Sequence, residues 1–320
     1  GALGINVTSL ENAGRIQGNT LTMNGSTLDN SGRLQGDNGL TLVIGDRLTN
    51  HQNGILFSQQ ALTLQAAQMT NDGVIQGGKQ TRLDITGTAQ NNGKLLFSDD
   101  LTFNASQLNN GGWLQATDLL LKAAQVENTG TLLAQQQGSF TGNSLINQGR
   151  IQGDRLTVNY QQLNNSGTVL GNQQLDVTAA NVEQQDGGKL LSGGNLTLKA
   201  NQLSPIGQLV ALGDVTATLA NAFTHRGTLA AGNQLTVTSN GAIDNQGVMQ
   251  GQGVNLSAGD ILSNSGKITT GTRASTLSGS QINLNDGGSV QGGGDISLTS
   301  RGDINVAGFT GTSGSLTLTA

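Results

Sequence analysis

The stretch Leu28-Asp29-Asn30-Ser31-Gly32-Arg33-Leu34, followed six residues later by Leu40-Thr41-Leu42, decides the fold, because the rest of the chain varies it. A typical unit has an apolar residue first, Asn at the third place and Gly at the fifth. Sixteen units of 18 to 22 residues begin at Leu10, Leu28, Leu48, Met69, Ala89, Leu108, Val126, Leu145, Leu163, Val182, Leu203, Phe223, Ile243, Leu262, Leu284 and Ile304. Self-similarity at this period is typical of a repeat array, which grows by adding units.

Apolar and polar residues alternate within a unit, as in a β-strand with one buried face. A second alternating stretch follows, as in Leu62-Thr63-Leu64 and Leu196-Thr197-Leu198. No stretch of ten residues has the period of a helix. The sequence therefore predicts an all-β fold, a parallel β-helix of about 16 stacked turns, each burying its apolar residues against the next. At about 4.8 Å per turn, these units would form a rod about 77 Å long.

Asn recurs at the third place of eleven units. These residues are Asn12, Asn30, Asn50, Asn71, Asn91, Asn110, Asn128, Asn147, Asn165, Asn245 and Asn264. Two explanations fit the pattern. Stacked amides can donate to and accept from one another inside the solenoid, and Asn also tolerates the left-handed backbone of a corner. We interpret the column as structural.

The pattern departs from this template in two places. Between residues 182 and 228 the third place holds Gln184, Pro205 and His225, which indicates drift in a tolerant repeat or, alternatively, a local bulge or partner-binding patch. From residue 282 the spacing loosens. We therefore divide the chain into regular repeats over residues 1–281 and looser repeats, continuous with them, over residues 282–320.

The amino-acid composition excludes several classes of partner and site. The chain has 15 Lys and Arg against 20 Asp and Glu, a net charge of −5, and no long run of like charge, so no nucleic-acid partner is predicted. No apolar run approaches the 18 residues or so of a transmembrane helix. With no Cys, disulfides and thiolate metal sites are excluded. We predict no cofactor.

One column carries charge. The place before the second apolar residue holds Arg15, Arg33, Lys94, Arg150, Lys189 and Lys267, with Trp113 in the same column. Alternation directs this column outward, where it could contact an anionic surface such as lipopolysaccharide or a sulfated glycan. Alternatively, the acids at the second places of the units pair with it, and the charges serve solubility. The expected pairs join Glu11, Asp29 and Glu183 to Arg15, Arg33 and Lys189.

Enzymatic chemistry has little support. His51 and His225 lie nine units apart, so they cannot share a metal ion. A carbohydrate lyase or hydrolase needs clustered carboxylates in a groove lined by aromatic residues. Asp99-Asp100 is the only adjacent acidic pair, and one Trp with one Tyr cannot line a groove. We predict that the chain is not an enzyme.

Units such as Leu28-Asp29-Asn30-Ser31-Gly32-Arg33-Leu34-Gln35-Gly36 and Leu163-Asn164-Asn165-Ser166-Gly167-Thr168-Val169 resemble the filamentous haemagglutinin repeats of two-partner-secreted exoproteins, which include haemagglutinin adhesins and effectors of contact-dependent growth inhibition. The resemblance covers about residues 10–320. It implies a right-handed β-helix, exported by an outer-membrane transporter and displayed on the surface of a Gram-negative bacterium. It carries over no catalytic residue, since the matching positions are structural.

Two functions remain from this reading. The even repeat, which has no enlarged loop, favours a stalk segment that projects a distal receptor-binding or toxin region. The alternative is an adhesin module, in which the surface of the repeats itself binds an outer-membrane receptor or a cell-surface glycan on a target cell.

Overall fold

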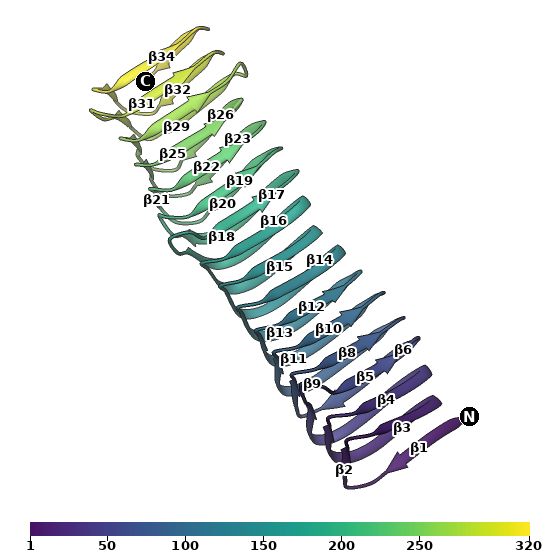
Figure 1. The fold of residues 1–320 in the computed structure, drawn as a ribbon. Coiled ribbons are helices and arrows are strands. Elements are labelled where there is room, and N and C mark those ends of the chain that lie inside the picture. Colours follow the sequence, from purple (N-terminus) through teal and green to yellow (C-terminus); the bar gives the residue numbers. More distant parts are fainter. The chain divides into compact units, whose positions relative to one another are not determined.

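The computed structural model describes all residues, Gly1–Ala320, and consists of β-strands and turns without a helix (Figure 1). Neighbouring strands pair in parallel, in a solenoid of about 17 turns of about 19 residues. The predicted all-β parallel solenoid is thus confirmed. One strand, Ala2–Asn6, precedes the first unit and pairs with Thr20–Asn24, which accounts for the additional turn.

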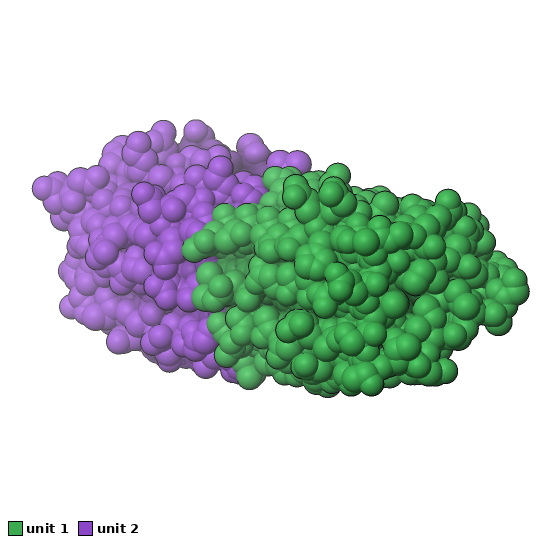
Figure 2. Space-filling model, turned by 60° about the horizontal axis from the view of Figure 1, so that its bottom comes forward, with its two compact units in different colours: residues 1–160 green, residues 161–320 purple.

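The chain divides into two compact units, residues 1–160 and 161–320, coloured separately in Figure 2. The strands of the first unit are β1 (Ala2–Asn6), β2 (Ser9–Asn12), β3 (Arg15–Asn30), β4 (Arg33–Asn50), β5 (Ile55–Ser58), β6 (Ala61–Ala66), β7 (Gln68–Asn71), β8 (Val74–Gly77), β9 (Thr81–Asn91), β10 (Lys94–Phe97), β11 (Leu101–Asn110), β12 (Trp113–Ala116), β13 (Leu119–Asn128) and β14 (Thr131–Asn147). Strand β15 (Arg150–Asn165) contains the boundary.

In the second unit only β16 is long, and every later strand has at most nine residues. The strands of this unit are β16 (Thr168–Gln184), β17 (Lys189–Ser192), β18 (Asn195–Leu203), β19 (Gln208–Ala211), β20 (Val215–Leu219), β21 (Phe223–His225), β22 (Thr228–Ala231), β23 (Gln234–Ser239), β24 (Ile243–Asn245), β25 (Val248–Gly251), β26 (Gly253–Ala258), β27 (Leu262–Asn264), β28 (Lys267–Thr270), β29 (Ser275–Gly279), β30 (Ile282–Leu284), β31 (Ser289–Gly292), β32 (Ile296–Ser300), β33 (Ile304–Val306), β34 (Phe309–Thr312) and β35 (Leu316–Thr319).

Each turn contributes strand segments to three faces, which β4 shows most clearly. Its first part pairs with β5, its middle with β6 and its last part with β7. We call the face of β7 the Asn face, because its segments end in the Asn column. The face of β5, β8, β10 and β12 is the basic face, since it carries the predicted basic column. The face of β6 is the Thr face, after the outward Thr of segments such as Leu62-Thr63-Leu64.

Side-chain alternation fills the interior. In β6 the side chains of Leu62 and Leu64 are fully buried, while Thr63 between them is partly exposed. The same positions recur in register one turn on, at Leu83 and elsewhere, so like residues stack along the interior. Tyr160 is also buried, and its hydroxyl donates to the backbone oxygen of Ala123 at 3.1 Å. Apolar burial along every turn is the main stabilising contribution.

The strand pairing shows that one of the predicted repeats begins at a different residue. Ile282, not Leu284, pairs with Leu262, and Leu284 lies opposite Asn264, at the place of the Asn column. The apolar-Asn-Gly template misplaced this unit because its corner is longer and contains Gly287, whose φ is +79°. Strands β27, β30 and β33 pair in parallel across residue 282. The division of the chain at that residue stays a prediction.

We expect Leu156→Asp to lower the free energy of unfolding by more than about 3 kcal/mol, because a charge would enter a side-chain position that is 1% exposed. The matched change Thr157→Asp, on the outward side of the same strand, should alter it by less than about 1 kcal/mol. Urea denaturation followed by circular dichroism measures both. Equal effects would show that the two residues are not on opposite sides of the strand.

Candidate functional site

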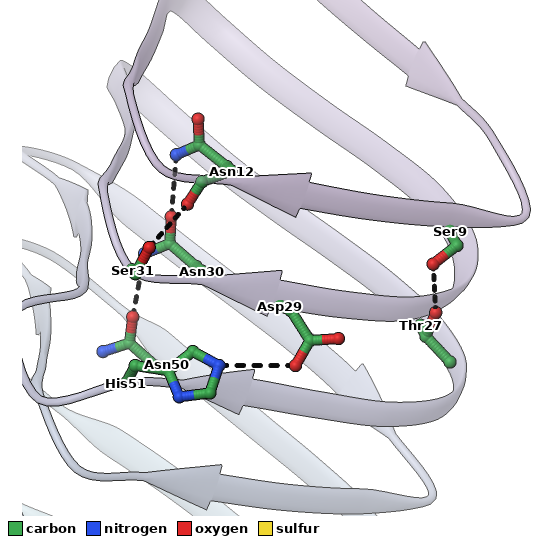
Figure 3. Close-up of polar contacts among 8 residues, drawn as sticks. All are labelled: Ser9, Asn12, Thr27, Asp29, Asn30, Ser31, Asn50 and His51. Atoms are coloured by element: carbon green, nitrogen blue, oxygen red, sulfur yellow. Dashed lines mark hydrogen bonds and ion pairs between the residues drawn. The ribbon is translucent and has the colours of Figure 1, made fainter.

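The Asn column of residues 1–160 forms a continuous ladder of side-chain hydrogen bonds. Each Nδ2 donates to Oδ1 of the Asn in the following turn, at 2.8 or 2.9 Å. The residues joined are Asn12, Asn30, Asn50, Asn71, Asn91, Asn110, Asn128 and Asn147. All are at most 6% exposed. Figure 3 shows the first three, with the exposed pair Asp29 and His51 beside them.

The ladder also holds the corner between the Asn face and the basic face. Asn30 Nδ2 lies 3.0 Å from the backbone oxygen of Gly32 in its own turn and 3.4 Å from that of Ile55 in the next. Each amide therefore satisfies backbone acceptors where strand pairing is interrupted. Of the two explanations for the Asn column, the inward ladder is the one observed. The left-handed corner is wrong, because no residue other than Gly has a positive φ.

The Gly at the fifth place follows from the same close packing. A Cβ on Gly93 would lie 2.1 Å from the backbone oxygen of Gly73, the equivalent residue one turn earlier. A Cβ on Gly112 would lie equally close to the oxygen of Gly93. Since real Cβ atoms do not approach a carbonyl oxygen this closely, a side chain here would push the turns apart. The Asn and Gly columns therefore form one corner.

Asn71→Ala should lower the free energy of unfolding by roughly 2 to 4 kcal/mol, because it removes the acceptor of Asn50 and the donor to Asn91 in a buried site. Asn92→Ala is the matched control. Asn92 is exposed, and its bonds to Gln90 and Asp72 are made in solvent, so its loss should cost less than about 1 kcal/mol. Urea denaturation distinguishes the two variants, and equal costs would contradict a stabilising role of the ladder.

The ladder changes in residues 161–320, where the sequence departs from Asn. Asn165 Nδ2 donates to Oε1 of Gln184 at 2.7 Å, and Gln184 Nε2 donates to the backbone oxygen of Gln208 at 2.9 Å. Gln184 thus carries the ladder one turn further. Pro205 has no donor to continue it, and Ser204 instead bonds the backbone nitrogen and oxygen of Gln184. Sequence reasoning missed Ser204, because it lies one place before the expected position.

His225 occupies the next ladder place and is 3% exposed. Its Nε2 donates to the backbone oxygen of Val248, at 3.0 Å. Burial lowers the pKa of His225 below its ordinary value, because the interior disfavours the charged ring; the hydrogen bonds to Val248 and Gly227 oppose this shift. The Asn ladder resumes one turn later, where Asn245 donates to Asn264 at 2.8 Å.

His225 makes stability depend on pH. The folded state keeps the ring neutral at a pH where the unfolded chain, with an ordinary His pKa of about 6.5, binds a proton. The unfolding free energy should therefore be level above about pH 7 and fall below it, by at most about 1.4 kcal/mol per pH unit. His225→Asn should remove this dependence. The test is the difference between the two proteins in urea denaturation from pH 7.5 to 5, and a constant difference would contradict it.

The predicted contact residues all lie on the outward side of the basic face. Arg15, Lys94, Trp113, Arg150, Lys189 and Lys267 are exposed, and Arg33 is partly buried. In the register Arg15 and Arg33 occupy consecutive turns, whereas Lys94 lies between Val74 and Trp113. The column is therefore mixed. Its role in contact with a partner stays a prediction.

The predicted ion pairs within a turn are wrong. Arg15 donates to Gln17 at 2.5 Å, Arg33 donates to Gln35 at 2.7 Å, and Asp29 lies 3.4 Å from the ring nitrogen of His51. The physical reason is the corner. Acids at the second place point away from the Asn face, while the basic column points away from the basic face. The two columns therefore diverge, although the members of a predicted pair are only four to six positions apart in the sequence.

Asp99 and Asp100 lie in the corner between the basic face and the Thr face. Burial raises the pKa of Asp100, as do the carboxylates of Asp118 and Asp99. A hollow of about 410 Å³ beside Asp100 is lined by Arg82 and several Thr residues, with no aromatic residue and no second carboxylate. No group of three or more His, Cys, Asp or Glu residues is placed to hold a metal ion. The arrangement lacks the parts of a glycosidase site.

A second hollow lies where the ladder changes. It has a volume of about 470 Å³ and is lined by residues between Gln162 and Thr224, including Glu183, Ser204 and Pro205. It forms where β18 ends at Leu203, two residues before the ladder place at Pro205, and where the next strand of the Asn face, β21, begins a separate sheet. The irregular window of the sequence thus coincides with a hollow of the surface, and its use as a binding patch stays a prediction.

The two described units define the class of protein: a parallel β-solenoid with a buried Asn ladder at one corner. The family model of the haemagglutinin repeat matches residues 1–52, 43–93, 80–155, 153–204, 192–273 and 267–320. The chain belongs to this family, as the resemblance implied. Proteins of this family are secreted to the cell surface of Gram-negative bacteria, in agreement with the predicted location.

Several curated proteins are similar over the whole chain. The tRNA nuclease CdiA of Escherichia coli (strain STEC_O31) is 48% identical over 316 residues, which are 99% of this chain and 9% of that protein. The 16S rRNA endonuclease CdiA of Enterobacter cloacae is 45% identical, and the deoxyribonuclease CdiA of Dickeya dadantii 37%, over 100% of this chain and 10% of each relative. No solved structure matches.

The chain spans about a tenth of the length of these relatives. Their names state nuclease activities on three different nucleic acids, while the repeats remain similar. The structure contains no helix that is long and apolar enough to cross a membrane.

Proposed function

We propose that this chain is a structural spacer in the filament of a CdiA-like exoprotein, where it holds a distal receptor-binding or toxin region away from the producing cell. The observation that supports this proposal is the parallel pairing of each turn with the next, which continues on the basic face and the Thr face where the Asn face is interrupted at Pro205. Every turn pairs with its neighbours through short corners, and the buried ladder satisfies the corner backbone. Such an array gains length by adding turns and needs no further core.

We further infer that nuclease activity lies outside this segment. The relatives are named for cleavage of tRNA, 16S rRNA and DNA, yet all are 37% to 48% identical to this chain over its whole length. A segment that is similar in all three relatives does not account for three different nuclease specificities. As in the family, export would use the outer-membrane transporter of the two-partner pathway, and recognition would use a receptor on a target cell.

Removal of whole turns tests the spacer. Deleting residues 74–130 joins Gly73 to Thr131. Thr131 occupies the place of Val74 three turns later, so the shortened chain should fold in the same register. If the segment is a spacer, its maximum dimension in small-angle scattering should fall by about 14 Å. Deleting only residues 84–93 removes half a turn and should prevent folding. A compact particle, or equal tolerance of both deletions, would contradict the proposal.

A second candidate function is binding through the basic face. The supporting observation is that the outward columns of this face combine the six basic residues with Trp113 and that its strand segments contain no Asp or Glu. Anionic glycans or lipopolysaccharide are the partners that this charge favours.

The charge-reversed variant with Arg15→Glu, Arg33→Glu and Lys94→Glu tests the second candidate. The affinity of the labelled variant for Gram-negative or epithelial cells should be at least about tenfold lower than that of the unmodified chain. Saturable binding of the unmodified chain should itself weaken as the salt concentration is raised. Lys122→Glu, on the Thr face, is the control. Absence of saturable binding by the unmodified chain would leave the spacer as the function of this segment.

A further inference from the structure

The basic face of residues 1–160 has an ordered charge pattern across its width. At the edge next to the Asn face lies the basic column, with Arg33 and Lys94. Next comes a column of apolar and Gln side chains, with Phe57 and Leu96. At the far edge, the corner toward the Thr face holds the acids Asp37, Asp99, Asp100 and Asp118. The turns of Arg33 and Lys94 therefore each present a positive edge, a less polar centre and a negative edge, whereas the turn of Val74 has Lys79 at its far edge.

Side-chain contacts place these groups on the face itself. The Arg33 guanidinium lies 5.0 Å from the centroid of the Phe57 ring in the next turn. Trp113 Nε1 donates to Gln115 Oε1 at 3.1 Å, so the indole lies along its own strand. Asp37 accepts a hydrogen bond from Gln17 Nε2 at 3.0 Å and so leans back over the face from its corner. These contacts hold the positive, aromatic and negative side chains over the basic face.

The pattern is complementary to itself in one orientation. A twofold axis that lies between two basic faces and parallel to the stacking direction exchanges the two edges but keeps every turn level with its copy. Arg33 of one copy then faces Asp37 of the other, and Lys94 faces Asp99 and Asp100. A twofold axis perpendicular to the stacking direction instead places the two basic columns against each other. Charge therefore selects the parallel arrangement.

We propose that two copies of this chain associate in parallel and in register through the basic faces of residues 1–160. The central column, with Phe57, Leu96 and Leu133, becomes buried between the copies. Eight turns of about 4.8 Å and segments of about four residues give a face of about 38 by 13 Å. This buries roughly 1,000 Å² in total, the lower limit for a specific interface, so the dimer is weak and reversible.

The acidic edge also benefits from a partner. In one copy, Asp99, Asp100 and Asp118 repel one another, and the pKa of Asp100 is raised, by burial first and then by its two acidic neighbours. The ammonium group of Lys94 from a second copy would lie among these carboxylates. The association is independent of the spacer function, because an array of turns can extend whether or not it pairs laterally.

Sedimentation equilibrium of the full chain at several salt concentrations tests the proposal. The chain should form a dimer that weakens as NaCl is raised. Lys94→Asp, and separately the pair Asp99→Lys and Asp100→Lys, should each weaken dimerisation at least about tenfold, while the three changes together should restore it. Lys122→Asp, on the Thr face, should have no effect. A monomer at all concentrations, or equal dimerisation by all variants, would overturn the proposal.

Disulfide trapping tests the orientation, since the chain has no Cys of its own. Gln76→Cys and Gln115→Cys lie two turns apart near the centre of the face. In a parallel, in-register dimer both single-Cys variants should form disulfide-linked dimers, because every turn lies level with its own copy. In an antiparallel dimer only one turn lies level with its copy, so at most one of the two variants should cross-link. Gln65→Cys, on the Thr face, is the control and should not cross-link.

A different occupant of the face would give a different result. If Lys94→Asp left dimerisation unchanged and abolished binding to immobilised heparin, the face would be a glycan site and the self-association proposal would fail. Failure of this proposal would not affect the turn-deletion result, so the two conclusions remain distinguishable.

Discussion

The buried side-chain amide is the interaction on which the corner of this solenoid depends. An amide removed from water must find partners for its donors and its acceptor. In a stack of parallel turns the nearest identical group lies one strand spacing away, and the geometry that joins Asn71 to Asn91 recurs in every turn of residues 1–160. The ladder therefore requires the turns to remain in register. Apolar packing, which has no direction, does not impose that requirement by itself.

Residues 161–320 show how the same constraint is met with other side chains. Gln184 reaches the backbone of the next turn with its longer side chain, Ser204 bonds the backbone of the preceding turn, and His225 uses a ring nitrogen. Each substitution keeps the buried polar groups partnered. The cost is regularity, because the Asn face loses its strand at Pro205 and the surface becomes hollow there. A titratable ring has also been introduced into an otherwise non-titrating column.

The three-sided turn separates groups that are close in sequence. Outward residues of the Asn face, the basic face and the Thr face have different surroundings, so each face can acquire its own chemistry without disturbing the shared interior. This explains how a structural spacer can carry a face that has no acid in its strands, next to a corner that holds acids in several turns.

The sequence by itself determined the repeat period, the alternation of buried and outward residues, the all-β class and the family, because these depend on local patterns of two and about twenty residues. It also located the Asn column and the outward basic column by residue number. Only the tertiary structure decided that Asn30 points inward and not into a left-handed corner, that Asp29 and Arg33 diverge, and that Ile282 and not Leu284 begins its unit. The physical reason is that these features depend on the direction of the chain at each corner. That direction is set by contacts with the turns above and below, which no stretch within a single unit encodes.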